Sequence, residues 1–521
     1  MNRTVMAAAL EARKEPWDVV IIGGGATGLG IAVDAASRGY STLLLERHDF
    51  AKGTSSRSTK LIHGGVRYLQ QGNVGLVLEA LRERGLLTQN APHLVGHLAF
   101  IVPSYVWWEA PFYGIGLKIY DLLAGKLGLG PSKHLSREET LARLPTLEPD
   151  GLKGGTIYYD GQFDDARLAV TLAMSAVDHG ATVLNYAPVV RFLKKNDLVR
   201  GVALQDLETG REHEVRARVV INATGVFADS VRRLDEPSGR GVIQPSQGIH
   251  VVLDKSFMPS DSAIMVPKTD DGRVLFCIPW HDRVLVGTTD TAVGEILEEP
   301  RPLDDEIEFL LTHAGRYLTK DPKRADVLSA FAGLRPLVRS TEANGTASVP
   351  RDHSVLVSQS GLVTVVGGKW TTYRKMAEDA VAQAAMVGGF EPRPCRTENL
   401  RLHGWQAAKK EDGHYRFYGA DQEALRQLAR SDARHAAVLH PRLPYRAAEV
   451  IWGVRNEMAR TLEDVLSRRT RALLLDARAS LEIAPLVASI MAAELGRSKE
   501  WEAEQLAAYR QLAERYIIAS R

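Results

Sequence analysis

A glycine-rich turn near the N-terminus constrains the fold more than any other feature of this 521-residue chain. The turn follows a β-branched run at residues 18–22 and precedes a predicted helix at 28–38 and a predicted strand at 41–46. Its glycines have the GxGxxG spacing and are Gly23, Gly25 and Gly28. Such glycines let the backbone approach a pyrophosphate at a helix N-terminus. The sequence therefore predicts a βαβ unit that binds a dinucleotide, with the carboxylate of Glu46 accepting the ribose hydroxyls.

The fingerprint alone fits NAD as well as FAD, and three further segments favour FAD. A second buried strand ends at Gly225, and a third, at 361–368, breaks at two glycines into a helix that starts near Thr371. A helix N-terminus at that point can stabilise negative charge on a reduced flavin. The hydroxyl-rich segment 53–60 can wrap the diphosphate and ribityl chain.

The remaining pattern indicates a chain with sheets first and helices last. Further helices are predicted over 75–91, 136–144 and 164–180, and further strands over 182–186, 200–206 and 213–221. Residues 243–290 alternate apolar and polar side chains between turn signals, which is typical of an antiparallel sheet. From about 395 onward no strand is expected and the pattern is helical, so a domain boundary is predicted at 390–400.

Composition excludes several kinds of protein. Lys and Arg total 65 against 63 Asp and Glu, so nothing indicates a nucleic-acid partner. Cys277 and Cys395 are far apart and have no metal-ligand spacing, which fits a reducing compartment and predicts no metal site. The apolar stretch 5–10 is too short for a signal peptide, and the uncharged stretch 19–33 falls short of the ~18 residues of a membrane span. These features predict a cytoplasmic protein and leave attachment to a membrane surface open.

Several motifs in order make the chain resemble one known family. They are Gly-Gly-Ala-Thr-Gly-Leu-Gly at 24–30, Thr-Ser-Ser-Arg-Ser-Thr-Lys-Leu-Ile-His-Gly-Gly-Val-Arg-Tyr-Leu at 54–69, Ala-Gly-Leu-Arg-Pro-Leu at 332–337, Gly-Gly-Lys-Trp-Thr-Thr-Tyr-Arg-Lys at 367–375 and a C-terminal stretch at 459–471. Together they are similar to the FAD-dependent, quinone-linked glycerol-3-phosphate dehydrogenase family, over about residues 16–515.

The resemblance implies an α/β fold, α+β in the substrate domain, with a core of D-amino-acid-oxidase type. A Rossmann-like FAD-binding domain is expected from 16–90, 150–235 and 350–390, an antiparallel-sheet substrate-binding domain from 91–149 and 236–349, and a helical domain from 395–521. The residues expected to bind FAD are Gly23, Gly25, Thr27, Gly28, Glu46, Thr54, Ser55, Ser56, Lys60, Leu61, Val189, Gly225, Gly368 and Thr371.

The implied reaction moves hydride from C2 of sn-glycerol 3-phosphate to the flavin and yields dihydroxyacetone phosphate. It requires cations for the phosphate and a base for the C2 hydroxyl proton. Positions that match the family near substrate and flavin, or that can add a phosphate ligand, are Arg67, Tyr68, Arg335, Arg351 and Lys369.

The base is expected to be His250, with His63 as the alternative, because an imidazole titrates near working pH. The chain departs from the family pattern beside these positions. It has Gln247 and Ile249 where many relatives carry Lys and Ser, and Trp370 where Leu is usual. These departures alter the expected shape of the site rather than the reaction class.

Electrons are expected to leave to ubiquinone or menaquinone at the membrane. Residues 105–134 interleave aromatic residues with lysines and suggest a segment lying in the bilayer interface, on the inner face of the cell membrane. The aromatic residues are Tyr105, Trp107, Trp108, Phe112, Tyr113 and Tyr120, and the lysines are Lys118, Lys126 and Lys133. Alternatives are an oxidase that reduces O₂ to peroxide, an amino-acid oxidase of similar fold, and a non-catalytic or RNA-modifying flavoprotein. The C-terminal domain is expected to cap the structure or to mediate a homodimer.

Overall fold

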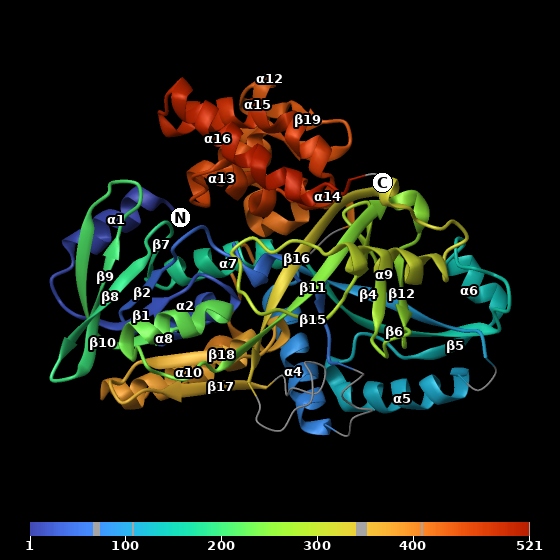
Figure 1. The fold of residues 1–521 in the computed structure, drawn as a ribbon, viewed down its shortest axis with the longest axis horizontal. Helices are drawn as coiled ribbons and strands as arrows, with labels where there is room; N and C mark the ends of the chain where they lie inside the picture. Colours follow the sequence, from blue (N-terminus) through green and yellow to red (C-terminus); the bar gives the residue numbers. More distant parts are fainter. Residues whose placement is uncertain (66–72, 107–108, 340–351, 408–409, 520–521) are drawn as a thin grey trace.

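Two large sheets stand side by side beneath a C-terminal helical domain, drawn in orange and red at the top of Figure 1. The computed structural model describes residues 1–65, 73–106, 109–339, 352–407 and 410–519. The predicted substrate ligands Arg67, Tyr68 and Arg351 lie outside the described residues, as do Trp107 and Trp108.

The first sheet contains the predicted βαβ unit. Its main path runs β17 (His353–Val357), β18 (Val363–Gly367), β10 (Glu212–Asn222), β1 (Trp17–Ile22), β2 (Thr42–Leu45) and β7 (Thr182–Leu184). All neighbouring pairs are parallel except the edge pair β17–β18. The β-branched side chains of β1 are buried, as expected of a strand covered on both faces. This confirms the strand, helix and strand predicted from the glycine spacing.

Helix α2 (Ala26–Ser37) packs against both α7 (Asp165–Asp178) and α10 (Tyr373–Gly388) along this sheet. Strands β8 (Val189–Lys195) and β9 (Leu198–Gln205) form a hairpin, and β9 pairs antiparallel with β10. A short N-terminal helix, α1 (Arg3–Ala12), was not apparent from the sequence. Its buried Arg3 binds the Asp206 carboxylate at 2.9 Å and so attaches the N-terminus to this domain.

The second sheet is mostly antiparallel, as predicted. Its strands are β3 (Leu61–Ile62), β4 (Val95–Ser104), β5 (Lys133–Leu135), β6 (Gly154–Phe163), β11 (Ile243–Asp254), β12 (Ser262–Val266), β13 (Leu275–Trp280), β14 (Arg283–Gly287), β15 (Thr291–Ala292) and β16 (Val327–Val338). The pair β4–β12 is parallel. The long pair β11–β16 places His250 opposite Phe331 and Ser246 opposite Arg335. The register of this pair therefore brings His250 and Arg335, two predicted catalytic residues, close together on one face of the sheet.

Strands β3 and β6 belong to the second sheet. Strands β3 and β6 pair in the second sheet, although residues 61–62 and 154–163 were assigned to the FAD-binding domain. Alternation along a strand shows which side chains face the core but not which strand is the partner. The chain therefore enters the second sheet at residues 61–62 and again at 154–163.

Helices α4 (Val74–Asn90), α5 (Glu109–Ala124), α6 (Arg137–Arg143), α8 (Ala228–Asp235) and α9 (Asp304–Gly315) surround the sheets. The predicted capping box of α6 is present, since the Ser136 hydroxyl accepts from Glu139 N and the Glu139 carboxylate accepts from Ser136 N. Across the described parts of the chain, every helix is too short or too polar to cross a membrane.

The C-terminal domain is helical as predicted, apart from one short hairpin that was not expected. Its helices include α11 (Gln422–Ser431), α12 (Ala433–Ala436), α13 (Ala447–Asn456), a π-helix at Asp464–Arg469, α14 (Ala472–Leu475), α15 (Ala477–Leu495) and α16 (Lys499–Ala513). A small hairpin, β19 (Val438–His440) and β20 (Leu443–Arg446), contradicts the expectation that no strand follows residue 395. Strands of three and four residues are too short to produce a readable alternation.

One histidine ties the C-terminal region to α7. His403 Nδ1 lies 2.6 Å from Asp178 and its Nε2 lies 2.9 Å from Asp421. Hydrogen bonds to Asp178 and then Asp421 raise the pKa of His403 to about 9. A raised pKa stabilises the fold below the ordinary value of 6.5, and this stabilisation is lost as pH rises through about 9.

We therefore expect His403→Gln to lower the melting temperature by about 1–3 °C at pH 6 and by progressively less toward pH 10. Differential scanning fluorimetry across this pH range measures the difference. Asp178→Asn, which removes one of the two carboxylates, should show the same pH dependence. A difference from wild type that stays constant from pH 6 to pH 10 would contradict the assignment of charge to His403.

Candidate functional site

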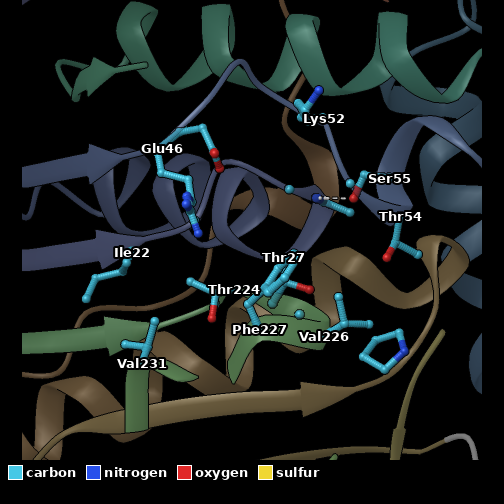
Figure 2. A pocket seen from close by; sticks show the side chains of 18 of the residues that line it. Ile22, Thr27, Glu46, Lys52, Thr54, Ser55, Thr224, Val226, Phe227 and Val231 are labelled. Atoms are coloured by element: carbon cyan, nitrogen blue, oxygen red, sulfur yellow. Dashed lines mark hydrogen bonds between the residues drawn. The ribbon is translucent and has the colours of Figure 1, made fainter. Parts of the chain in front are cut away.

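A cavity of about 500 Å³ opens where the parallel strands of the first sheet end (Figure 2). Residues at the carboxyl ends of β1, β2, β10 and β18 line it together with the N-terminus of α2. Ligands bind at this edge in open parallel sheets. The predicted cofactor residues that line the cavity are Gly23, Gly25, Thr27, Glu46, Thr54, Ser55, Val189, Gly225 and Gly368. Lining residues that the sequence did not single out include Lys52, Thr224, Phe227 and Val231.

Glu46 is held in place at the end of β2. Its Oε2 accepts from Gly24 N at 2.6 Å, and its Oε1 accepts from His48 N at 2.8 Å. Burial raises the pKa of Glu46, while these backbone donors oppose the rise. Each carboxylate oxygen retains a second lone pair. The arrangement fits the predicted role of accepting ribose hydroxyls.

Two glycines of the turn are required by close approaches. Gly23 has φ +112°, and a Cβ there would lie 2.6 Å from Ala223 O. A Cβ at Gly28 would lie 1.9 Å from Gly23 O, because α2 passes directly over the turn. Gly28 does not line the cavity itself, and its absent side chain lets the helix N-terminus reach the diphosphate position.

We expect Gly28→Ala to reduce the FAD bound by purified protein at least about tenfold, because the clashing atom is backbone and cannot rotate away. The ratio of absorbance at 450 nm to that at 280 nm measures the loss. Gly294→Ala is the control, since nothing in the described structure lies within 4 Å of a Cβ there. Gly28→Ala protein with full flavin content would contradict the proposed fit of α2 over the turn.

Residues 53–55 of the hydroxyl-rich segment line the cavity. Ser55 Oγ accepts from Ala26 N at 2.9 Å, a bond drawn as a dashed line in Figure 2. Thr54 Oγ1 donates to Leu334 O at 2.6 Å. Trp370 Nε1 donates to Ser55 O at 3.0 Å, so this departure from the family pattern supports the same segment. The loop is therefore held by both domains.

Other predicted cofactor residues lie away from this first cavity. Ser56 is buried, and the Lys60 ammonium is fully buried against Asp165 at 2.6 Å. Burial lowers the pKa of Lys60 to about 8, against the opposing charge of Asp165. Leu61 and Thr371 line a second, adjoining cavity instead.

The second cavity has a volume of about 200 Å³ and contains all three predicted catalytic residues: His250, Arg335 and Lys369. It shares several lining residues with the first cavity, namely Thr54, Pro336, Gly367, Gly368, Lys369 and Trp370. The two spaces are therefore neighbours, with Lys369 at their common wall. His63 is a described residue but is not part of either lining.

His250 is almost fully buried on β11. Its Nε2 lies 2.9 Å from Thr59 Oγ1, and its ring stacks on Phe331 with centroids 5.0 Å apart. Its Nδ1 has no hydrogen-bond partner among the described residues. Burial, then the charges of Lys60 and Arg335, hold the pKa of His250 well below its ordinary value. The imidazole is therefore neutral and able to accept a proton.

Arg335 is oriented by its neighbouring strand β11 and by the segment that joins β14 to β15. Its Nη2 donates to Thr289 O at 2.8 Å, and its Nη1 donates to Gln247 O and to Asp290 Oδ1, each at 3.2 Å. A Cβ at Gly248 would lie 2.2 Å from Nη2, so the guanidinium occupies space that only glycine leaves. The cation is fixed at the cavity wall rather than free in solvent.

The sequence did not reveal a group of buried charges behind the site. The Asp49 carboxylate binds Arg468 at 2.6 Å and Arg469 at 2.7 Å, and Asp165 binds Arg471 at 2.8 Å. All five side chains are at most 2% exposed. The similarity at 459–471 marked these arginines without assigning them a role. Three arginines fall within the four residues 468–471, between apolar residues on both sides. This pattern could have indicated buried ion pairs, because buried charges require partners.

The cavities fit the cofactor that the sequence predicts. The glycine turn under a helix N-terminus suits a diphosphate, Glu46 suits a ribose, and 500 Å³ lies within the range of ligand sites. The glycine pair that ends β18 and the 3₁₀ turn Trp370–Thr372 face the junction with the second cavity, where a flavin ring would meet a substrate.

Comparisons with known proteins agree with this geometry. The family described as FAD dependent oxidoreductase matches residues 18–374, and that described as the C-terminal domain of alpha-glycerophosphate oxidase matches residues 363–502. The mitochondrial glycerol-3-phosphate dehydrogenase of Rattus norvegicus is 42% identical over 94% of this chain and 72% of its own length. The Homo sapiens protein of the same name is 41% identical over the same shares.

Among solved structures, the glycerol-3-phosphate dehydrogenase of Bacillus halodurans, complexed with FAD, superposes with a TM-score of 0.80. It is 30% identical, and the match covers 99% of this chain and 98% of that one. The fold is therefore of D-amino-acid-oxidase type with a C-terminal helical domain, and FAD is the cofactor. The chain belongs to the FAD-dependent glycerol-3-phosphate dehydrogenase family.

Proposed function

We propose that this oxidoreductase converts sn-glycerol 3-phosphate to dihydroxyacetone phosphate and passes two electrons to a membrane quinone. The observation that carries the proposal is one small cavity in which His250, Arg335 and Lys369 meet beside the FAD cavity. The names of the relatives support the same substrate. An amino-acid substrate would require one cation for its carboxylate, whereas Arg57, Arg335 and Lys369 all line this cavity.

The chain's residues have separable roles in the proposed reaction. The neutral imidazole of His250 accepts the proton of the C2 hydroxyl, so that the C2–O bond becomes a carbonyl as hydride leaves C2. Bound FAD supplies the acceptor for that hydride. Arg335 and Lys369 attract the anionic substrate and stabilise negative charge that develops at the junction of the cavities. Arg67, Tyr68 and Arg351 remain predicted phosphate ligands.

The test is anaerobic mixing of purified yellow protein with sn-glycerol 3-phosphate while the flavin absorbance is followed. Loss of the 450 nm band supports donor and cofactor together. Retention of the band with this donor, combined with its loss on adding an amino acid, would exclude the proposed substrate. Reoxidation by a soluble quinone, compared with peroxide formation in air, then separates the dehydrogenase from the alternative oxidase.

Exposed apolar side chains on α5 support the proposed attachment to a membrane surface. They are Ile115, Ile119 and Leu122, which are 65%, 45% and 80% exposed, and Val74 and Leu78 on neighbouring α4 are similarly exposed. Helices α4 and α5 lie together at the edge opposite the C-terminal domain (Figure 1). Such a face suits insertion into the interfacial region of a bilayer. The proposed location is the inner face of the cell membrane, and a homodimer remains a prediction.

Two aromatic residues expected in the interface are instead buried or tied to the core. Tyr120 is 1% exposed and donates to Asp160 Oδ2 at 2.9 Å. Tyr105 donates to Glu148 O at 2.8 Å and packs against Tyr317. Aromatic content alone does not reveal which face of a helix is covered.

We expect the double variant Ile119→Ser, Leu122→Ser to lower binding to anionic lipid vesicles about tenfold or more, because it removes most of the apolar area of two exposed side chains. Vesicle co-sedimentation measures binding, and flavin reduction by substrate should not change. Leu207→Ser, which alters a side chain 49% exposed in another part of the molecule, is the control. Equal vesicle binding by all three proteins would contradict the assignment of this face.

A further inference from the structure

Segment 56–60 borders the second cavity and also reaches a buried ion pair behind it. Arg57, Ser58 and Thr59 line the second cavity. Ser58 and Lys60 reach the buried carboxylate of Asp165. The segment therefore lies between the reaction space and a buried ion pair, and Ser58 borders both.

Asp165, the first residue of α7, gathers the inner side of the segment. Its Oδ2 accepts from Ser58 N at 3.0 Å, from Ser58 Oγ at 2.8 Å and from Lys60 Nζ at 2.6 Å. Its Oδ1 accepts from Ala166 N at 2.9 Å. A carboxylate with this many donors has a single orientation and fixes the segment at residues 58 and 60.

Arg471 of the C-terminal domain completes the arrangement. Its Nη2 donates to Asp165 Oδ1 at 2.8 Å and to Ser56 O at 3.0 Å. Lys60 Nζ donates to the same Ser56 carbonyl at 2.8 Å. Arg471 is 1% exposed, and Asp165 and Lys60 are 0% exposed. A residue 415 positions away in sequence therefore holds the beginning of segment 56–60.

On the outer side, Thr59 contacts the imidazole that lines the second cavity. Thr59 Oγ1 lies 2.9 Å from His250 Nε2. A hydrogen bond to one ring nitrogen orients the ring and selects which nitrogen carries the proton. Arg57 donates to Glu299 at 2.7 Å, so the other outward side chain of the segment is also fixed.

We propose that Asp165 and Arg471 are positioning residues that hold the Thr59 hydroxyl against His250, so that the C-terminal domain sets the orientation of the imidazole. The proposal rests on the proposed function only in treating His250 as the base. The ion pair does not touch the cavities and acts through segment 56–60. A buried ion pair alone is weak evidence of stabilisation, which makes a positioning role testable apart from stability.

The test is a double-mutant cycle on flavin reduction under anaerobic conditions. Thr59→Val removes the hydroxyl at constant shape, and Arg471→Lys keeps the charge but removes the planar fork. Each single variant should slow reduction about tenfold through misalignment of the base. If Arg471 acts through Thr59, the double variant should also be slowed about tenfold rather than about a hundredfold.

Arg469→Lys is the matched control. Arg469 is equally buried in the same domain interface but binds Asp49 rather than segment 56–60. It should lower the melting temperature about as much as Arg471→Lys, and its effect on reduction should multiply with that of Thr59→Val. Should Arg471→Lys fail to fold, Ser58→Ala takes its place in the cycle, because it removes one donor to Asp165 and no charge. The proposal would be overturned if the slowing of flavin reduction in the double variant equalled the product of the two single effects, in the cycle of Thr59 with Arg471 or with Ser58.

A second readout does not depend on the reaction. Hydrogen–deuterium exchange of the amides at 56–62 should be at least about tenfold faster in Arg471→Lys than in wild type. In Arg469→Lys these amides should exchange as in wild type. If the wild-type flavin is not reduced by glycerol 3-phosphate, the proposed function fails while the exchange comparison still decides the positioning role. Unchanged exchange in Arg471→Lys would exclude it.

Discussion

His250→Asn is expected to slow flavin reduction by glycerol 3-phosphate by a factor of about 10²–10⁴, the range that a positioned base contributes. Asparagine can retain a hydrogen bond to Thr59 but cannot accept the C2 hydroxyl proton. FAD content should remain that of wild type, because His250 does not line the first cavity. Anaerobic stopped-flow spectroscopy at saturating substrate measures the rate.

The pH dependence makes this prediction sharper. Because burial and neighbouring cations lower the pKa of His250, its proton-accepting form persists to well below pH 6.5. The ratio of the wild-type rate to the His250→Asn rate should therefore be constant above pH 6.5 and decline only at lower pH. Using the ratio cancels the titration of the substrate phosphate, which occurs near pH 6.

His63→Asn is the comparison variant. Its carbonyl accepts from Thr371 Oγ1 at 3.4 Å, and its side chain lines neither cavity, so its rate should stay within about threefold of wild type. A large loss in His63→Asn with little change in His250→Asn would reverse the assignment of the base.

Asp49→Asn is expected to cost about 3–5 kcal/mol of stability, the penalty for breaking a buried ion pair by removing one charge. The carboxylate lies between Arg468 and Arg469 at 2.6 and 2.7 Å, and all three side chains are buried. Burial raises the pKa of Asp49, but Arg469 and Arg468 outweigh it and lower the pKa below its ordinary value. Asparagine has nearly the same shape and supplies no negative charge.

Thermal inactivation half-lives and urea-induced loss of flavin fluorescence quenching measure this effect. Glu482→Gln is the control, because Glu482 pairs with Arg442 at 3.0 Å where both side chains are about half exposed. Exposed pairs contribute about 0–1 kcal/mol. Equal stability of Asp49→Asn and wild type would show that the remaining partners of the two arginines suffice.

Local chemistry in the sequence predicted local structure well. The glycine spacing, Glu46 and the strand pair around them are consecutive, so backbone geometry and capping rules apply directly. The capping box of Ser136 and Glu139 is another example, complete within four residues. The roles of His250 and Arg335 were inferred from the resemblance to a family. The register of β11 and β16 explains why these two residues, 85 positions apart, line one cavity.

What the sequence did not reveal depends on contacts between distant segments. The bond between Asp165 and Arg471 joins residues 306 positions apart, and neither has a neighbour that indicates the other. The burial of Tyr120 depends likewise on Asp160, which lies on a different element. Propensity and periodicity describe one segment at a time, whereas tertiary packing decides which side chains are covered.

The arginines behind the cofactor loop also affect the order in which the molecule is completed. Bonds from Arg468, Arg469 and Arg471 reach back 419, 420 and 415 residues to Asp49 and Ser56. At usual rates of translation the loop waits about 20–80 s for these partners to be synthesised. An incomplete chain that already contains the glycine turn should therefore bind flavin weakly until the C-terminal domain has been synthesised. Protein truncated before Arg468 should accordingly be purified with little flavin.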